Sequence, residues 1–183
     1  MGWLARAAVA LVLLAGMTAG ASTRADELEY RVKAEFIERF TRFVDWPIRT
    51  FNSPEGSFVL CVMGDTPMEP HLERLARDRR IKDRPVELRH LKAGADVSGC
   101  HVLFIAPTER ARLKQILAHS AGRAVLTVAD AEGFAQQGVL INLIVDDDGH
   151  VRFEICSTQL HKSGLNVSAQ MLRLARLVEE PSP

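Results

Sequence analysis

Apolar residues recur at about every third or fourth position in residues 28–44, which places them on one face of a helix. They are Leu28, Val32, Phe36, Phe40, Phe43 and Val44. The pattern ends at Trp46-Pro47, because a proline keeps the residue before it out of the α-helical region. The spacing therefore predicts one amphipathic helix that ends at this Trp-Pro pair.

The rest of the chain alternates short apolar runs with amphipathic stretches. The apolar runs predict strands at residues 57–63, 85–91, 101–106, 123–129, 138–145 and 151–157. The amphipathic stretches predict helices at residues 67–78, 108–120 and 168–178, and a short helical piece at 131–137. Between the last two strands, residues 146–149 are Asp-Asp-Asp-Gly, which favours a hairpin turn.

This order of elements predicts an α/β fold with a mostly parallel, flavodoxin- or Rossmann-like sheet and helices on both faces. The hairpin adds a C-terminal antiparallel pair of strands. The sequence has no internal repeat and no linker, so we expect a single domain over residues 26–179.

The first 21 residues have the pattern of a signal peptide. Arg6 precedes an apolar run, residues 7–21, that is shorter than the ~20 residues of a bilayer span. The run closes in Ala19-Gly20-Ala21, the form of a signal-peptidase site, and Thr23-Arg24-Ala25 offers a second site. We therefore expect export, with cleavage after residue 21 or as late as residue 25. A buried N-terminal helix or a retained anchor is the alternative.

Acidic and basic residues balance, at 23 each. A neutral chain has no general attraction to nucleic acid or anionic lipid, so no nucleic-acid partner is expected. The basic stretch at residues 74–84 is interrupted by acidic residues and carries no aromatic side chain, which argues against a nucleic-acid groove. It fits a solvated helix end, with a contact patch for an acidic partner as the alternative.

Motifs that carry catalysis or metal binding are missing from the sequence. The six histidines lack the i,i+4 spacing that two metal ligands on one helix need. They are His71, His90, His101, His119, His150 and His161. Neither G-x-S-x-G nor S-x-x-K occurs. The sequence therefore predicts no enzyme, no cofactor and no metal site.

The loop after the strand at 57–63 begins with Gly64 and resembles a phosphate loop only at first sight. A phosphate loop uses several glycines and often a lysine, whereas this loop has one glycine and no lysine. Thr66, Pro67 and Glu69 instead fit a capping box, with Thr66 as the N-cap of the next helix. The loop is therefore interpreted as a helix start.

Three cysteines are available for disulfide bonding in an exported chain. Cys61 lies in a predicted strand and Cys100 directly precedes the strand at 101–106. A bridge between them would close a loop of about 40 residues and contribute roughly 4 kcal/mol. Cys156 would then be a free thiol or a competing partner, and the residues alone leave this open.

The order of these elements resembles the YfiR family of bacterial periplasmic proteins, from about residue 28 to residue 178. The segments that carry the resemblance are VKAEFIERFTRFVDWP, FVLCVMGDTPM, CHVLFIAPTE, GFAQQGVLINLIVDDDGHVRFEI and SAQMLRLA. Each segment is an ordinary α/β element, and their shared order makes chance a poor explanation.

The resemblance implies a periplasmic regulator without enzymatic activity. The best-known member of the family binds the periplasmic sensor domain of an inner-membrane diguanylate cyclase and holds the cyclase inactive, which lowers cyclic di-GMP and biofilm formation. An outer-membrane lipoprotein draws that member away. For this chain, the resemblance implies the same two partners and leaves a homodimer open. It also implies a disulfide between Cys61 and Cys100, whereas the family's second cysteine pair is not matched near Asn142.

A partner-binding surface needs apolar side chains with a polar rim. Trp46, Pro47 and Phe51, after the first helix, are the candidates, with core packing as the alternative for Trp46. Arg152 and Glu154 alternate with apolar residues, so we expect them on the outer face of the last strand, as rim contacts or as solvated residues.

A periplasmic small-ligand sensor is the second functional hypothesis. In a parallel sheet, ligands bind in the crevice outside the carboxyl ends of the strands. Two of the predicted central strands end at the residues that would line this crevice, which are Gly64, Asp65, Pro107 and Thr108.

Overall fold

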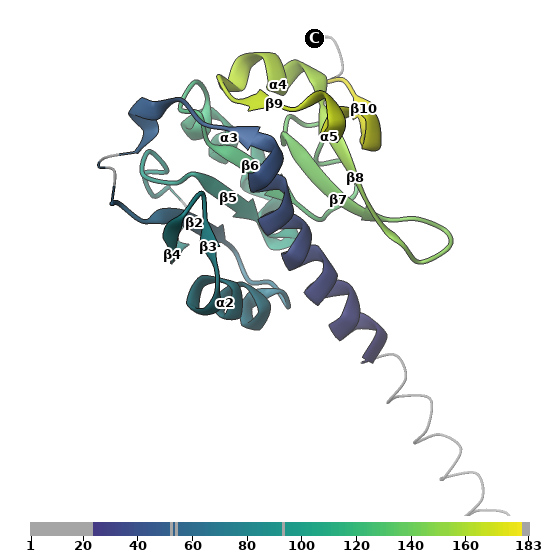
Figure 1. Cartoon of the computed structure of the whole chain (residues 1–183). Coiled ribbons are helices and arrows are strands. Elements are labelled where there is room, and N and C mark those ends of the chain that lie inside the picture. Colours follow the sequence, from purple (N-terminus) through teal and green to yellow (C-terminus); the bar gives the residue numbers. More distant parts are fainter. Residues whose placement is uncertain (1–23, 52, 54, 93, 181–183) are drawn as a thin grey trace, which may run out of the picture.

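The computed structural model describes residues 24–180, apart from residues 52, 54 and 93 (Figure 1). The predicted signal peptide, residues 1–21, lies outside the described residues. Within them, no helix has both the length and the apolar character needed to cross a membrane. The domain limits at residues 26 and 179 stay a prediction.

An eight-stranded mixed sheet forms the centre of the fold, in the order β10-β8-β7-β6-β5-β2-β4-β3. Its parallel strands are β4 (Arg84–Leu91), β2 (Phe58–Met63), β5 (Val102–Ile105), β6 (Leu126–Ala129) and β7 (Ile141–Val145). β8 (Val151–Cys156) runs antiparallel to β7, and the edge strands are β3 (Arg80–Ile81) and β10 (Arg176–Val178). This topology confirms the predicted α/β class and its C-terminal hairpin.

Helices cover both faces of the sheet (Figure 1). A long N-terminal helix, residues 24–43, lies on one face. Its neighbours on that face are α2 (Glu69–Asp78), α4 (Ser157–Ser163) and α5 (Ala169–Leu174). The opposite face is covered by the 3-10 helix η2 (Pro107–Arg112) and by α3 (Leu113–Ser120).

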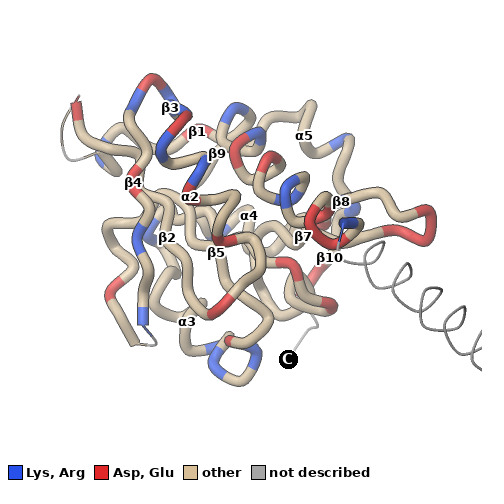
Figure 2. The backbone as a smooth tube through the Cα atoms, turned by 90° about the horizontal axis from the view of Figure 1, so that it is seen from below, with Lys and Arg blue, Asp and Glu red and all other residues tan. Residues whose placement is uncertain are grey.

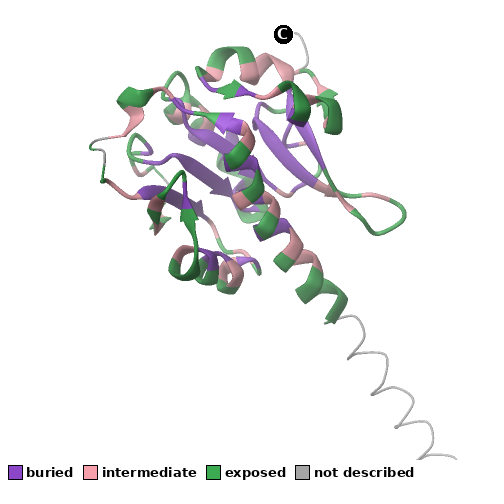
Figure 3. Cartoon of the chain, viewed as in Figure 1, coloured by how far each residue is buried: buried purple, intermediate pink, exposed green. Residues whose placement is uncertain are grey.

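Alternate side chains of β2 enter two separate cores. The core under the N-terminal helix takes Phe58, Leu60 and Val62, and the core under α3 takes Val59, Cys61 and Met63. All six residues are buried, as are all residues of the neighbouring strand β5, whereas β4 on the other side has no buried residue (Figure 3). A strand covered on both faces requires an apolar residue at every position, which explains the continuous apolar run in the sequence.

The N-terminal helix packs on β8 through aromatic rings. The ring centroids of Phe40 and Phe153 are 5.0 Å apart, and Phe36 lies 6.2 Å from Phe153. The helix ends one residue before Val44, which begins a two-residue strand that the apolar pattern did not predict. This strand, β1 (Val44–Asp45), pairs antiparallel with β9 (Asn166–Val167).

Three predicted helices differ from the structure. The helix predicted over residues 108–120 is α-helical only at Leu113–Ser120, because Pro107–Arg112 form a 3-10 helix. Residues 131–137 form successive turns, because Gly133 and Gly138 adopt positive φ angles of 78° and 102° that interrupt helical hydrogen bonding. The predicted C-terminal helix ends at Leu174, and β10 follows because residues 176–178 pair with β8. Long-range pairing thus replaces the last turns of the predicted helix.

The predicted capping box is wrong in register. α2 begins at Glu69, and its N-cap residue, Met68, makes no side-chain cap. Thr66 Oγ1 instead accepts a hydrogen bond from the amide of Met68, 3.2 Å away, and so stabilises the turn before the helix. The Glu69 carboxylate pairs with His90 rather than with the backbone.

A disulfide joins Cys61 of β2 to Cys100, with 5.8 Å between their Cα atoms. In the sheet, Cys61 of β2 lies opposite Leu103 of β5. Cys100 is therefore three residues before the residue that faces Cys61. A turn in which the Cys100 amide donates to the Val97 carbonyl brings the two cysteines together. Cys156 is free and buried, and burial raises the pKa of its thiol.

Reduction of the disulfide should lower the free energy of unfolding by about 4 kcal/mol, because the bridge closes a loop with a sequence separation of 39 residues. Urea denaturation with and without reductant measures the difference. A Cys61→Ser variant should lose this dependence on reductant, whereas a Cys156→Ser variant should keep it. Equal reductant effects in the two variants would contradict the prediction.

Candidate functional site

Trp46 is a core residue rather than a surface contact. Its side chain is 8% exposed and packs edge-on against Phe58, with the ring centroids 5.2 Å apart. The indole Nε1 donates a hydrogen bond to the His101 carbonyl, 3.1 Å away. Trp46 therefore packs in the core, which the sequence analysis gave as the alternative to a surface contact. Its contacts hold the end of the N-terminal helix against the sheet.

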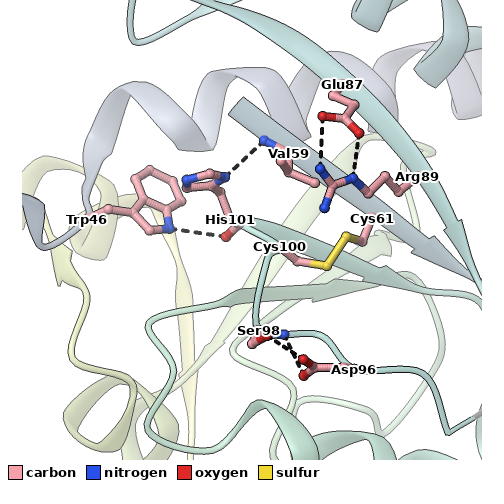
Figure 4. Close-up of a disulfide and its surroundings, with 9 residues drawn as sticks. All are labelled: Trp46, Val59, Cys61, Glu87, Arg89, Asp96, Ser98, Cys100 and His101. Atoms are coloured by element: carbon pink, nitrogen blue, oxygen red, sulfur yellow. Dashed lines mark hydrogen bonds and ion pairs between the residues drawn. A yellow bond between two sulfur atoms is a disulfide. The ribbon is translucent and has the colours of Figure 1, made fainter. Parts of the chain in front are cut away.

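His101 is stacked between two phenylalanine rings. Its ring centroid lies 4.6 Å from that of Phe51 and 4.8 Å from that of Phe58. Nδ1 accepts a hydrogen bond from the Val59 amide at 2.9 Å (Figure 4). Burial, assisted by the nearby Arg84 cation, lowers the pKa of His101 to about 4, so the ring is neutral at ordinary pH.

Phe51 also contacts a cation. The Arg84 guanidinium lies 4.2 Å from the Phe51 ring centroid, a cation–π contact. Arg84 Nη1 also donates hydrogen bonds to the Ser53 and Gly56 carbonyls, at 2.8 Å and 2.9 Å. These contacts fix both ends of the segment that joins the N-terminal helix to β2.

A short turn projects between these anchors. It consists of Pro47, the 3-10 helix η1 (Ile48–Thr50) and Phe51, and we call it the 47–51 turn. Pro47 and Phe51 are partly buried, whereas Ile48 is 86% exposed. The sequence analysis missed Ile48, because it lies outside any periodic pattern. A lone isoleucine between proline and arginine was the signal that could have identified it.

The two predicted rim residues of the hairpin lie in different environments. Arg152 is exposed, and its Nε lies 2.9 Å from an Asp146 carboxylate oxygen. Glu154 is only 2% exposed, so its predicted place on an outer, solvated face is wrong. The physical reason is β10, which pairs with β8 and places Arg176 against Glu154.

Acidic residues gather at the tip of the β7–β8 hairpin (Figure 2). Asp146, Asp148 and His150 each offer one atom that could bind a metal ion, and these three atoms lie within 4.8 Å of one another. Asp146 Oδ1 already accepts hydrogen bonds from the amides of Asp148 and His150, at 3.1 Å and 2.8 Å. These hydrogen bonds and the ion pair with Arg152 use the Asp146 carboxylate to stabilise the turn. This agrees with the hairpin turn predicted from the sequence.

The predicted ligand crevice is an open cavity of about 390 Å³, lined by Gly64, Asp65 and Thr108 but not by Pro107. Gly64 has a φ of 85°, and a Cβ there would lie 2.5 Å from Thr108 Oγ1. The close approach of η2 is therefore sufficient to explain why residue 64 is a glycine, and no ligand is needed for that explanation. Ligand binding in this crevice stays a prediction.

The family model described as YfiR/HmsC-like matches residues 30–176. The chain belongs to the YfiR/HmsC-like family. The match spans the sheet from β2 to β8 and confirms the resemblance seen in the sequence. None of the curated proteins compared with the chain matches it.

Members of the YfiR/HmsC-like family are periplasmic regulators rather than enzymes. In this member, the 47–51 turn is the candidate site for a regulatory contact, because it presents an exposed apolar side chain on a fixed backbone. The turn also lies near the disulfide. Phe51 stacks on His101, and His101 directly follows the disulfide-bonded Cys100 in the chain (Figure 4).

The pKa of His101 predicts a pH-dependent stability for this YfiR/HmsC-like protein. The folded-state pKa of about 4 lies below the unfolded value of about 6.5, so the unfolded chain binds the proton first as the pH falls. The stabilisation contributed by neutral His101 is therefore fully present above pH ~6.5 and is lost as the pH falls toward ~4, by about 2 kcal/mol after allowance for solvent screening.

A His101→Gln variant keeps a hydrogen-bond acceptor but does not titrate. Urea denaturation of both proteins between pH 7.5 and pH 4.5 should show a flatter pH dependence for the variant. Parallel curves would contradict the assignment, because the other titrating groups are common to both proteins.

Proposed function

We propose that this chain is a periplasmic regulator that restrains an inner-membrane diguanylate cyclase by binding the cyclase's periplasmic sensor domain. Membership of the YfiR/HmsC-like family supports the regulatory role and the periplasmic location. In this proposal the bound regulator lowers cyclic di-GMP and biofilm formation. An outer-membrane lipoprotein that competes for the regulator, and a homodimer, are further parts of the same proposal.

The observation that carries the proposal is the exposure of Ile48, at 86%, in a turn that is anchored at both ends. An apolar side chain that is exposed on a fixed backbone can enter a partner's pocket with little loss of conformational entropy. A few side chains that fill pockets of the partner carry most of the binding energy of an interface. Exposed Arg49 supplies a polar rim beside it.

The anchors of the 47–51 turn contribute to binding indirectly. Trp46 and Phe51 hold the turn through His101 and Arg84, and neither projects as far as Ile48. We therefore assign Trp46 and Phe51 a positioning role, and assign Pro47 and Ile48 to the contact surface. On the hairpin, Arg152 is accessible to a partner, whereas buried Glu154 is not.

Deleting the gene should raise cellular cyclic di-GMP, because the cyclase loses its inhibitor. Extraction and quantification of cyclic di-GMP measure the effect, and expression of the chain from a plasmid should restore the low level. An unchanged level in the deletion strain would contradict the cyclase-inhibitor proposal.

Ile48→Asp should weaken binding of the purified sensor domain by at least tenfold, because a charge replaces the apolar contact. The matched control is Leu28→Asp, a second exposed apolar residue, at 51%, near the start of the N-terminal helix. Calorimetric titration gives both affinities, and thermal denaturation checks that the variants fold. Equal affinity for Ile48→Asp and wild type would remove the 47–51 turn from the interface.

A further inference from the structure

The sheet is open at one side along most of β4 (Figure 1). On its inner side, β4 pairs with β2 from Val86 to Leu91. On its outer side, β3 pairs only with Arg84 and Pro85. Within the described residues, no other strand pairs with residues 86–91 from that outer side. The free edge is therefore longer than the whole of β10 at the opposite side of the sheet, which has three residues.

An open strand edge presents unpaired N–H and C=O groups, and so it can accept another strand. Many proteins block such an edge with proline or lysine. The only proline of β4, Pro85, is covered by β3, and residues 86–91 contain neither proline nor lysine. Val86 and Leu88 pack against the core under the N-terminal helix but are only partly buried. The free edge of β4 is therefore suited to pairing with a further strand.

Two side chains of opposite charge lie on this edge, on the same face of the sheet. Glu87 and Arg89 are two residues apart, and Arg89 Nε and Nη2 donate to the two carboxylate oxygens of Glu87 at 2.6 Å and 3.0 Å (Figure 4). Both side chains are 44% exposed. The hydrogen bond from Arg89 lowers the pKa of Glu87, so the carboxylate is ionised at neutral pH. An acidic and a basic residue at this spacing make the edge complementary in charge to a second copy of itself.

Charge favours one register for such a pair of β4 strands. In an antiparallel pair related by a two-fold axis perpendicular to the sheet, one residue faces its own copy. If that residue is Leu88, Glu87 of each copy faces Arg89 of the other, which is favourable. If it is Glu87 or Arg89, like charges face each other, which is destabilising. If it is His90, neither charge faces its opposite.

The length of the free edge favours the same register. With Leu88 facing its own copy, Val86 faces His90, and the next pair outward would be Pro85 and Leu91. β3 already pairs with Pro85, so the pairing between copies ends after five residues. The register that pairs the charges is thus also the one that is centred between the two β3 strands.

We propose that two copies of this chain associate by antiparallel pairing of their β4 strands, with Leu88 facing its own copy across a two-fold axis. The pairing joins two sheets into one and forms two ion pairs between copies, each from Glu87 to Arg89. Because both copies use the same edge, association stops at a dimer. This inference rests on the homodimer of the proposed function and assigns its surface, and it does not depend on the cyclase partner.

Sedimentation velocity of the purified chain without its predicted signal peptide tests the pairing. The wild type should shift from monomer to dimer as its concentration rises. Glu87→Arg and Arg89→Glu should each weaken dimerisation at least tenfold, because each substitution acts twice across the two-fold axis. The double variant Glu87→Arg/Arg89→Glu restores both ion pairs and should dimerise like the wild type. Glu35→Arg is the matched control, since it removes an exposed ion pair with Arg39 on the N-terminal helix and should leave dimerisation unchanged.

A mixture of the two single variants separates a contact between copies from an effect within one chain. The Glu87→Arg chain is basic at both positions, and the Arg89→Glu chain is acidic at both. The mixture should therefore form a mixed dimer at least tenfold more tightly than either variant forms its own dimer. Thermal denaturation of each variant checks that it folds.

The inference is wrong if the wild type stays monomeric up to millimolar concentration. It is also wrong if the single variants dimerise like the wild type, because the dimer then uses another surface, or if mixing them restores no association. The cyclase proposal is tested separately, by binding of the purified sensor domain. A dimeric wild type that does not bind this domain contradicts the cyclase proposal and leaves the β4 pairing in place.

Discussion

The burial of β2 on both faces is the constraint on which the other contacts of this fold depend. On one face, Phe58 packs against Trp46 and His101 and so fixes the end of the N-terminal helix. On the other face, Cys61 is bonded to Cys100 and so fixes the start of β5. β2 therefore holds both the end of the N-terminal helix and the start of β5, and the 47–51 turn lies next to these two segments. Truncation of a buried phenylalanine such as Phe58 typically lowers the free energy of unfolding by about 3–5 kcal/mol, so one side chain of β2 contributes a large part of the stability.

The same constraint explains how an exposed isoleucine can be held on an ordered backbone. The 47–51 turn is closed by hydrogen bonds from the Thr50 and Phe51 amides to the Pro47 and Ile48 carbonyls, and its Phe51 end is held by aromatic and cation–π contacts. His101 belongs to these contacts and is also the residue next to the disulfide. One residue, His101, therefore lies next to the disulfide in the chain and against the 47–51 turn in space.

The sequence predicted what depends on local periodicity. The helix over residues 28–44 and the apolar strands follow from side chains that repeat on one face or are buried on both. The prediction was wrong where backbone conformation or distant pairing decides the structure. Gly133 and Gly138 turn residues 131–137 out of a helix, and β10 covers Glu154 through contacts between residues 22 positions apart. Ile48 was missed because exposure depends on how the flanking anchors are held, which one segment of sequence does not specify.

The N-terminal helix connects the 47–51 turn to an open cavity of about 490 Å³. Lys33 lies in the wall of this cavity, and ten residues after it the helix ends and leads into Trp46 and the 47–51 turn. Phe36 and Phe40, which lie between these sites, pack against Phe153 and restrict how the helix can shift. A ligand changes the affinity for a partner only if it moves or stiffens this helix, and a well-packed core opposes such movement. Any coupling between a molecule bound in this cavity and a partner bound at the 47–51 turn would be reciprocal, so each would change the affinity for the other by the same factor.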